Sequence, residues 1–133
     1  MKFITLILLL SFWFLSCSQK EQISNKQKFV SKFDKASEYT YKPDKLPEPP
    51  GGIKNIQDRI IVPDVVKNGA VKGRVYVNTF VNENGTVDFV EVTQGLDNDC
   101  DKEALRVIKE TIFQPGIKDG TKVKTAIVIP VTF

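Results

Sequence analysis

The order of hydrophobic periodicities in residues 73–133 is the feature that most restricts how this chain can fold. Residues 73–82, 86–93 and 122–133 are rich in β-branched and aromatic side chains, which predicts three strands. The first and last of these have a period near two, whereas the valines of residues 86–93 are too irregular for one face and suggest a bulge. Asn84-Gly85 between the first two predicts a hairpin turn. The segment before the last strand has Cys100, Ala104, Val107, Ile108 and Thr111 at helical spacing, with charged side chains between them.

This order predicts an α+β fold, with one main helix packed on a three-stranded antiparallel sheet. A helix that crosses the sheet lets the last strand pair antiparallel with the first, which gives the spatial order second, first, last. Pro130 lacks an N–H donor, and this fits a strand at the edge of the sheet. One or two short helices, at residues 53–61 and 64–69, are expected before the first strand.

The amino terminus has the features of a targeting segment. Lys2 precedes the apolar run Phe3–Leu15, which is shorter than the roughly 20 residues that a membrane-spanning helix needs. The run ends in Leu15-Ser16-Cys17 and resembles a bacterial lipoprotein signal. We therefore expect a signal peptide at residues 1–16 and lipid on Cys17, which would attach the protein to a membrane. The alternatives are an ordinary signal peptide or an uncleaved inner-membrane anchor.

A polar segment separates this signal from the folded part. Residues 17–46 are rich in lysine, serine and glutamine, and their few aromatic residues keep no period, so we expect a flexible tether. Prolines and Gly51-Gly52 then mark a boundary, and we place the folded domain at residues 47–133.

The composition argues against an enzyme. The chain has no histidine, which removes the commonest general base and the commonest metal ligand. Its two cysteines are Cys17 and Cys100, and we interpret Cys100 as a buried apolar residue. A net charge of +3 with scattered lysines gives no argument for nucleic acid. We expect no catalytic residues, no metal and no cofactor.

Several short motifs occur in a recognisable order. They are Pro49-Pro50-Gly51-Gly52, Val62-Pro63, Gly73–Val77, Asn84–Val87, Asp101–Val107, Phe113–Gly116 and Pro130–Phe133. With this order and spacing, residues 47–133 resemble the carboxy-terminal domain of TonB proteins, in the form common in Bacteroidetes. The family usually has tyrosine at the position of Val62, tryptophan at that of Phe113 and leucine at that of Cys100.

The resemblance implies a periplasmic module of a Gram-negative cell envelope. Such a module binds the extended TonB box of an outer-membrane receptor as an added strand, in energy-coupled transport, here as transducer or accessory. An edge strand can accept such a peptide through its free backbone groups. We expect Ile127→Pro to abolish this binding while the fold survives. The expected partner contacts are in the last strand: Lys122, Val123, Lys124, Thr125, Ala126, Ile127, Val128 and Ile129.

Two points stay open at this stage. Lys122 and Lys124 could attract an acidic peptide, or they could only protect the edge from aggregation. TonB proper is held by a transmembrane helix that engages a proton-channel complex, and a lipid anchor offers no such surface. The alternative function is therefore a lipid-anchored envelope scaffold, or a homodimer formed through the same edge, without energy transduction.

Overall fold

The computed structural model describes residues 35–133, and Glu38–Phe133 form one compact unit. The expected signal peptide at residues 1–16, the lipidation site Cys17 and the first part of the tether lie outside the described residues. Within residues 35–133 no helix combines the length and the apolar character that a membrane span requires.

The unit is built on a three-stranded antiparallel sheet, which confirms the predicted α+β fold. Its strands are β1 (Arg74–Val81), β2 (Val87–Gln94) and β5 (Thr125–Thr132), in the order β2-β1-β5. This is the predicted order of second, first and last strand. The register sets Val77 opposite Ile129 and Tyr76 opposite Pro130. The proline-containing strand therefore lies at an edge, as expected.

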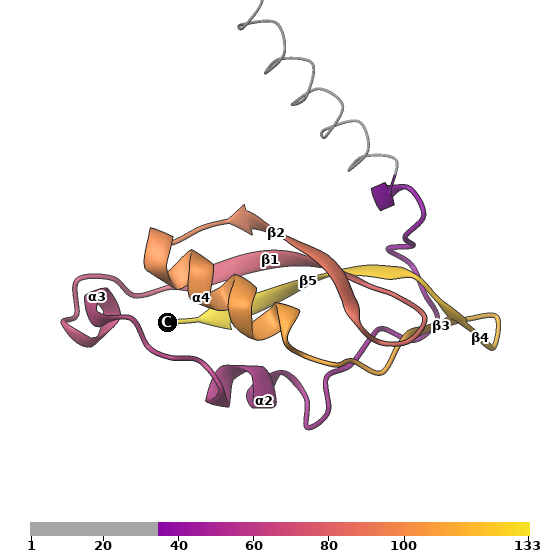
Figure 1. The fold of residues 1–133 in the computed structure, drawn as a ribbon, viewed down its shortest axis with the longest axis horizontal. Coiled ribbons are helices and arrows are strands. Elements are labelled where there is room, and N and C mark those ends of the chain that lie inside the picture. The colour runs from indigo at the N-terminus through magenta and orange to yellow at the C-terminus, as the bar shows by residue number, and fades with distance from the viewer. Residues whose placement is uncertain (1–34) are drawn as a thin grey trace, which may run out of the picture. The chain divides into compact units, whose positions relative to one another are not determined.

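One face of the sheet is covered by the helix α4 (Asn98–Lys109), as Figure 1 shows. Asp97 caps this helix because its carboxylate accepts the Asp99 N–H at 3.0 Å. Two short helices, α2 (Ile53–Asp58) and α3 (Asp64–Lys67), precede the sheet as predicted. The helix and the strand residues that face it form the core: Val75, Val77, Val81, Cys100, Ala104, Val107, Ile108, Ile129 and Val131.

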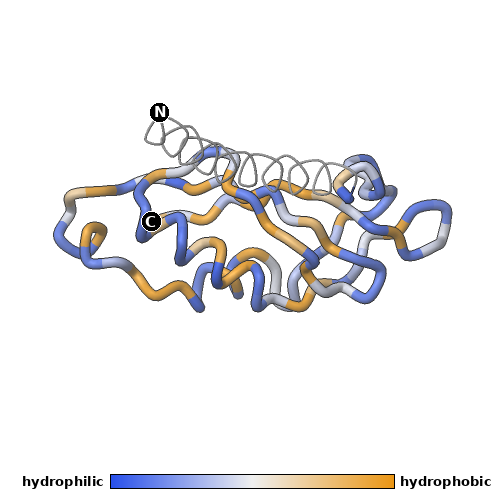
Figure 2. Tube along the Cα trace, turned by 45° about the horizontal axis from the view of Figure 1, so that its top comes forward, coloured by the Kyte–Doolittle hydropathy of each residue, from blue (hydrophilic) through white to orange (hydrophobic). Residues whose placement is uncertain are grey.

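The last predicted strand is divided in two, so the prediction of one strand over residues 122–133 was wrong. β3 (Gly116–Lys118) and β4 (Thr121–Val123) pair with each other in a separate two-stranded ribbon, and β5 begins only at Thr125. The cause is the turn at Asp119-Gly120, where both residues have positive φ, 51° and 76°. Figure 2 shows the end of this ribbon in the hydrophilic colour.

The compact unit also begins earlier than the expected boundary at Pro47. Bridges join Thr40 to Thr125, Lys45 to Ile117 and Glu48 to Gln114. Residues 38–46, expected to be part of a flexible tether, are thus attached to the sheet and the ribbon. The physical reason is that a single aromatic side chain, Tyr39, is buried against the sheet, and a single residue produces no period in the sequence.

The β1–β2 turn is hydrogen-bonded to the segment that follows α4. Gly85 has φ 86°, and its carbonyl accepts the Phe113 N–H at 2.7 Å. A Cβ on Gly85 would lie 1.9 Å from the Phe113 oxygen, so this close approach requires glycine. This hydrogen bond fixes the β1–β2 turn against the segment between α4 and the ribbon. Both lie at the end of the sheet where β5 begins.

Candidate strand-binding edge

The outer edge of β5 alternates between residues that bond β1 and residues whose backbone faces outward. The Ala126 N–H donates to the Thr40 carbonyl, and the Thr40 N–H donates to the Lys124 carbonyl, each at 3.0 Å. Successive residues of an antiparallel edge strand alternate in direction. Ala126, Val128, Pro130 and Thr132 therefore turn their backbone groups outward, whereas Ile127 and Ile129 turn theirs toward β1.

The far end of this edge is occupied by a side chain. The Gln57 amide of α2 donates from Nε2 to the Thr132 carbonyl at 2.5 Å, and its Oε1 accepts the Thr132 N–H at 3.1 Å. One side-chain amide thus satisfies both outward groups of Thr132, as a neighbouring strand would. Thr40 at one end and Gln57 at the other leave the middle of β5 between them.

This middle part, Ala126–Pro130, is called the open window below. Its outward groups are the carbonyls of Ala126, Val128 and Pro130 and the N–H of Val128, and no residue of the described part of the chain bonds them. The Val128 side chain is 52% exposed. The window offers one donor and three acceptors to an added strand, because Pro130 has no N–H.

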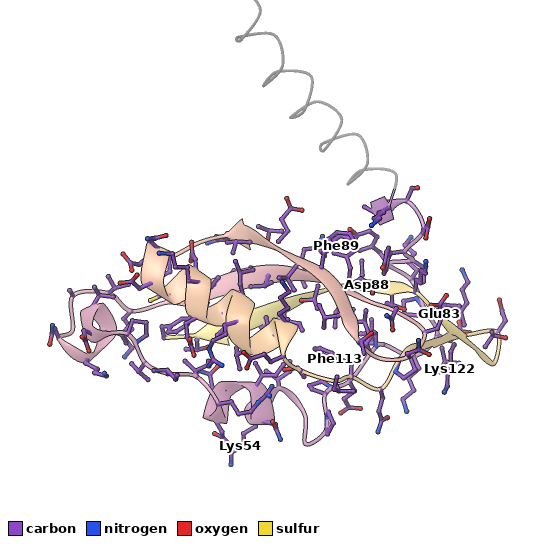
Figure 3. All side chains as sticks on the ribbon, viewed as in Figure 1. Lys54, Glu83, Asp88, Phe89, Phe113 and Lys122 are labelled. Atoms are coloured by element: carbon purple, nitrogen blue, oxygen red, sulfur yellow. The ribbon has the colours of Figure 1, made fainter. Side chains whose placement is uncertain are left out.

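Beside the window, an aromatic cluster lies on the sheet face opposite α4. The rings of Phe80 and Phe89 stack at 3.9 Å, and Tyr39 meets them edge-on at 5.2 and 5.7 Å. The Tyr39 hydroxyl donates to the Asp88 carboxylate, and burial together with this bond raises the pKa of Tyr39. In Figure 3, Asp88 and Phe89 are neighbours on β2 at this cluster. The cluster holds Tyr39 next to the start of β5.

A charged hollow lies at the same end. It is lined by Glu38, Thr40, Glu83, Lys118, Lys122, Val123 and Lys124. The Lys124 ammonium donates to Glu38 at 2.6 Å, and this bond raises the pKa of Lys124. Figure 3 shows Glu83 at the β1–β2 turn and Lys122 on the ribbon, both at this end of the unit. The hollow has both signs of charge, so it gives no simple preference for an acidic peptide.

The structure therefore separates the predicted contact residues into four groups. Lys122 and Val123 belong to β4, and the Lys124 carbonyl is already bonded by Thr40. Thr125, Ile127 and Ile129 direct their backbone groups toward β1, so of the predicted set only Ala126 and Val128 contribute outward backbone groups to the open window.

Sequence reasoning missed Gln57 and Thr40 as parts of this edge, and it did not include Pro130 among the partner contacts. The proline marked the edge itself, but no sequence pattern shows which residues of an edge strand are already bonded.

The comparisons with known proteins agree with this architecture. Residues 63–133, more than half of the chain, match the family described as Gram-negative bacterial TonB protein C-terminal. No curated protein matches the chain. The chain is similar to a solution structure of the Helicobacter pylori TonB carboxy-terminal domain at 18% identity and a TM-score of 0.50, over 61% of this chain and 86% of that one. A longer form of that domain gives 22% identity and a TM-score of 0.43, over 61% and 77%. The chain belongs to the family of Gram-negative TonB carboxy-terminal domains.

Proposed function

We propose that this chain is a periplasmic peptide-binding module that captures an extended partner segment by strand addition to β5. The family takes part in TonB-dependent transport across the cell envelope, so the proposed partner is the TonB box of an outer-membrane receptor. The observation that carries the proposal is the open window, where four backbone groups in a row have no bond within the described residues.

The composition of the window defines what the added strand has to supply. Val128 would donate one hydrogen bond to a partner carbonyl, and the carbonyls of Ala126, Val128 and Pro130 would accept N–H groups of the partner. Each such bond contributes about 0.5–1.5 kcal/mol net. A partner with a proline at a donating position would lose one of these bonds. The exposed Val128 side chain adds an apolar contact on the face opposite α4.

The membrane attachment is a separate part of the proposal. Lipid on Cys17, after removal of residues 1–16, would hold the domain near one membrane of the envelope. In this arrangement the protein acts as an accessory that binds receptors. An intact amino terminus would instead support a transducer with a signal anchor.

The test is the binding of a fluorescently labelled TonB-box peptide to the purified full chain, measured by anisotropy. Val128→Pro removes the only outward donor of the window, and we expect it to weaken binding by about twofold to tenfold. Val128→Thr keeps the N–H and the β-branched shape, so it is the matched control and should bind as the wild type does.

Two results would contradict the proposal. One is equal affinity of the Val128→Pro and Val128→Thr variants, because the peptide would then not use this edge. The other is no binding to any variant while the chain self-associates in sedimentation experiments, which would favour the dimer or scaffold instead.

A further inference from the structure

The edge of β5 already has one strand partner, which comes from the chain itself. Thr40 forms a parallel bridge with Thr125, through its N–H to the Lys124 carbonyl and its carbonyl to the Ala126 N–H. This is the hydrogen-bond pattern of an added parallel strand. The chain thus occupies the first positions of the edge that the proposed partner would use.

Three side chains hold this segment in place. Tyr39, only 8% exposed, contacts Phe80 and Phe89 and donates its hydroxyl hydrogen to Asp88. Glu38 accepts a hydrogen bond from Lys124 at 2.6 Å. Tyr41 accepts a bond from the Asn78 amide at 3.2 Å. We call residues 38–41 the latch. Its contacts join it to β1, β2 and the start of β5.

The latch ends after a single bridge for a local reason. In a continued parallel strand, the N–H two residues after Thr40 would donate to the Ala126 carbonyl. The Lys42 N–H instead donates to the Thr40 hydroxyl at 3.2 Å, and Pro43 follows close behind with no N–H. The chain therefore leaves the edge here, and the open window begins at the Ala126 carbonyl.

We infer that the latch is an internal competitor that limits the length of the edge available to a partner strand. This inference rests on the proposed function. A strand that pairs only with the open window can bind beside the latch. A strand that pairs from Lys124 to Pro130 has to replace both bonds of Thr40. Its apparent affinity is then reduced by the fraction of molecules in which the latch is released.

The test uses the full chain and the same TonB-box peptide. Tyr39→Ala removes the ring that holds the latch, whereas Tyr39→Phe keeps the ring and loses only the bond to Asp88. We expect the Tyr39→Ala variant to bind the peptide about tenfold more tightly than the wild type, and the Tyr39→Phe variant to bind almost as the wild type does. Hydrogen exchange at Ala126 should become faster in Tyr39→Ala, while the β1–β5 amides of Val77 and Ile129 stay protected.

A second variant avoids the aromatic cluster in case Tyr39→Ala disturbs the fold. Glu38→Lys places two like charges where the ion pair with Lys124 is now, and it should tighten peptide binding about twofold to threefold. Equal peptide affinity in wild type, Tyr39→Ala and Glu38→Lys would overturn the latch inference and leave the proposed function standing. Absence of peptide binding in all of them would overturn the proposed function, and the inference with it.

Discussion

Two neighbouring proline substitutions in β5 should have opposite consequences. The Ile127 N–H faces β1, opposite Thr79, whereas the Val128 N–H faces outward into the open window. Ile127→Pro should therefore damage the sheet. Val128→Pro should leave the sheet intact and remove only the donor for a partner. This corrects the expectation from the sequence that Ile127→Pro abolishes binding without affecting the fold.

The expected magnitudes follow from burial. Thr79 is 0% exposed, and a buried carbonyl that loses its donor costs about 1–3 kcal/mol. Ile127 also packs against the core, so its replacement by the smaller proline adds roughly 1 kcal/mol. Val128 is 52% exposed and loses no bond to β1, so its replacement should cost less than about 1 kcal/mol.

The assay is urea unfolding of the two full-chain variants, followed by circular dichroism. The free energies of unfolding should differ by about 2–3 kcal/mol, with Ile127→Pro the less stable. In thermal melts this corresponds to a midpoint lower by roughly 10–20 °C. Equal loss of stability in both variants would show that the assignment of inward and outward backbone groups along β5 is wrong.

Three further predictions concern other parts of the chain. Gly85→Ala should destabilise the unit by more than about 3 kcal/mol in urea unfolding, because the new Cβ would meet the Phe113 carbonyl. Gly120 also has positive φ, but a Cβ there would have no atom within 4 Å, so Gly120→Ala should cost only about 1–2 kcal/mol. The pKa of Tyr39 is raised in the folded protein, so its hydroxyl keeps its proton there, whereas in the unfolded chain it ionises near pH 10. The free energy of unfolding should therefore decrease as the pH rises above about 10, and this contribution to the decrease should be absent from Tyr39→Phe. Mass spectrometry of the purified membrane form should find an acylated amino-terminal peptide that begins at Cys17, and an unmodified peptide that begins at Met1 would contradict the lipoprotein prediction.

The sheet order was predictable because a few local rules define it. The Asn84-Gly85 turn joins the first two strands, and a crossing helix brings the last strand back antiparallel to the first. Pro130 then fits only an edge position. Each of these signals lies within a few residues, so a single sequence contains it.

The residues that already bond the edge of β5 were not predictable, because their contacts are not local in the sequence. Residues 121–123 have the alternation of a strand in either pairing, and only the Asp119-Gly120 turn decides that they join the ribbon instead of β5. The bonds of Gln57 and Thr40 to β5 join residues far apart in the sequence. No local period marks such a contact, because a single side chain or a single bridge produces it.

The position of the latch in the chain has a mechanical consequence. Residues 38–41 come before every strand of the sheet, so tension applied to the chain upstream of Glu38 reaches the latch before it reaches β1. The latch would yield first, because one parallel bridge and the side-chain contacts of Glu38, Tyr39 and Tyr41 carry that load, whereas the β1–β5 ladder shares its load over many paired positions. Tension on the chain upstream of Glu38 would then lengthen the accessible edge of β5, so more backbone groups would be available to a bound strand under load.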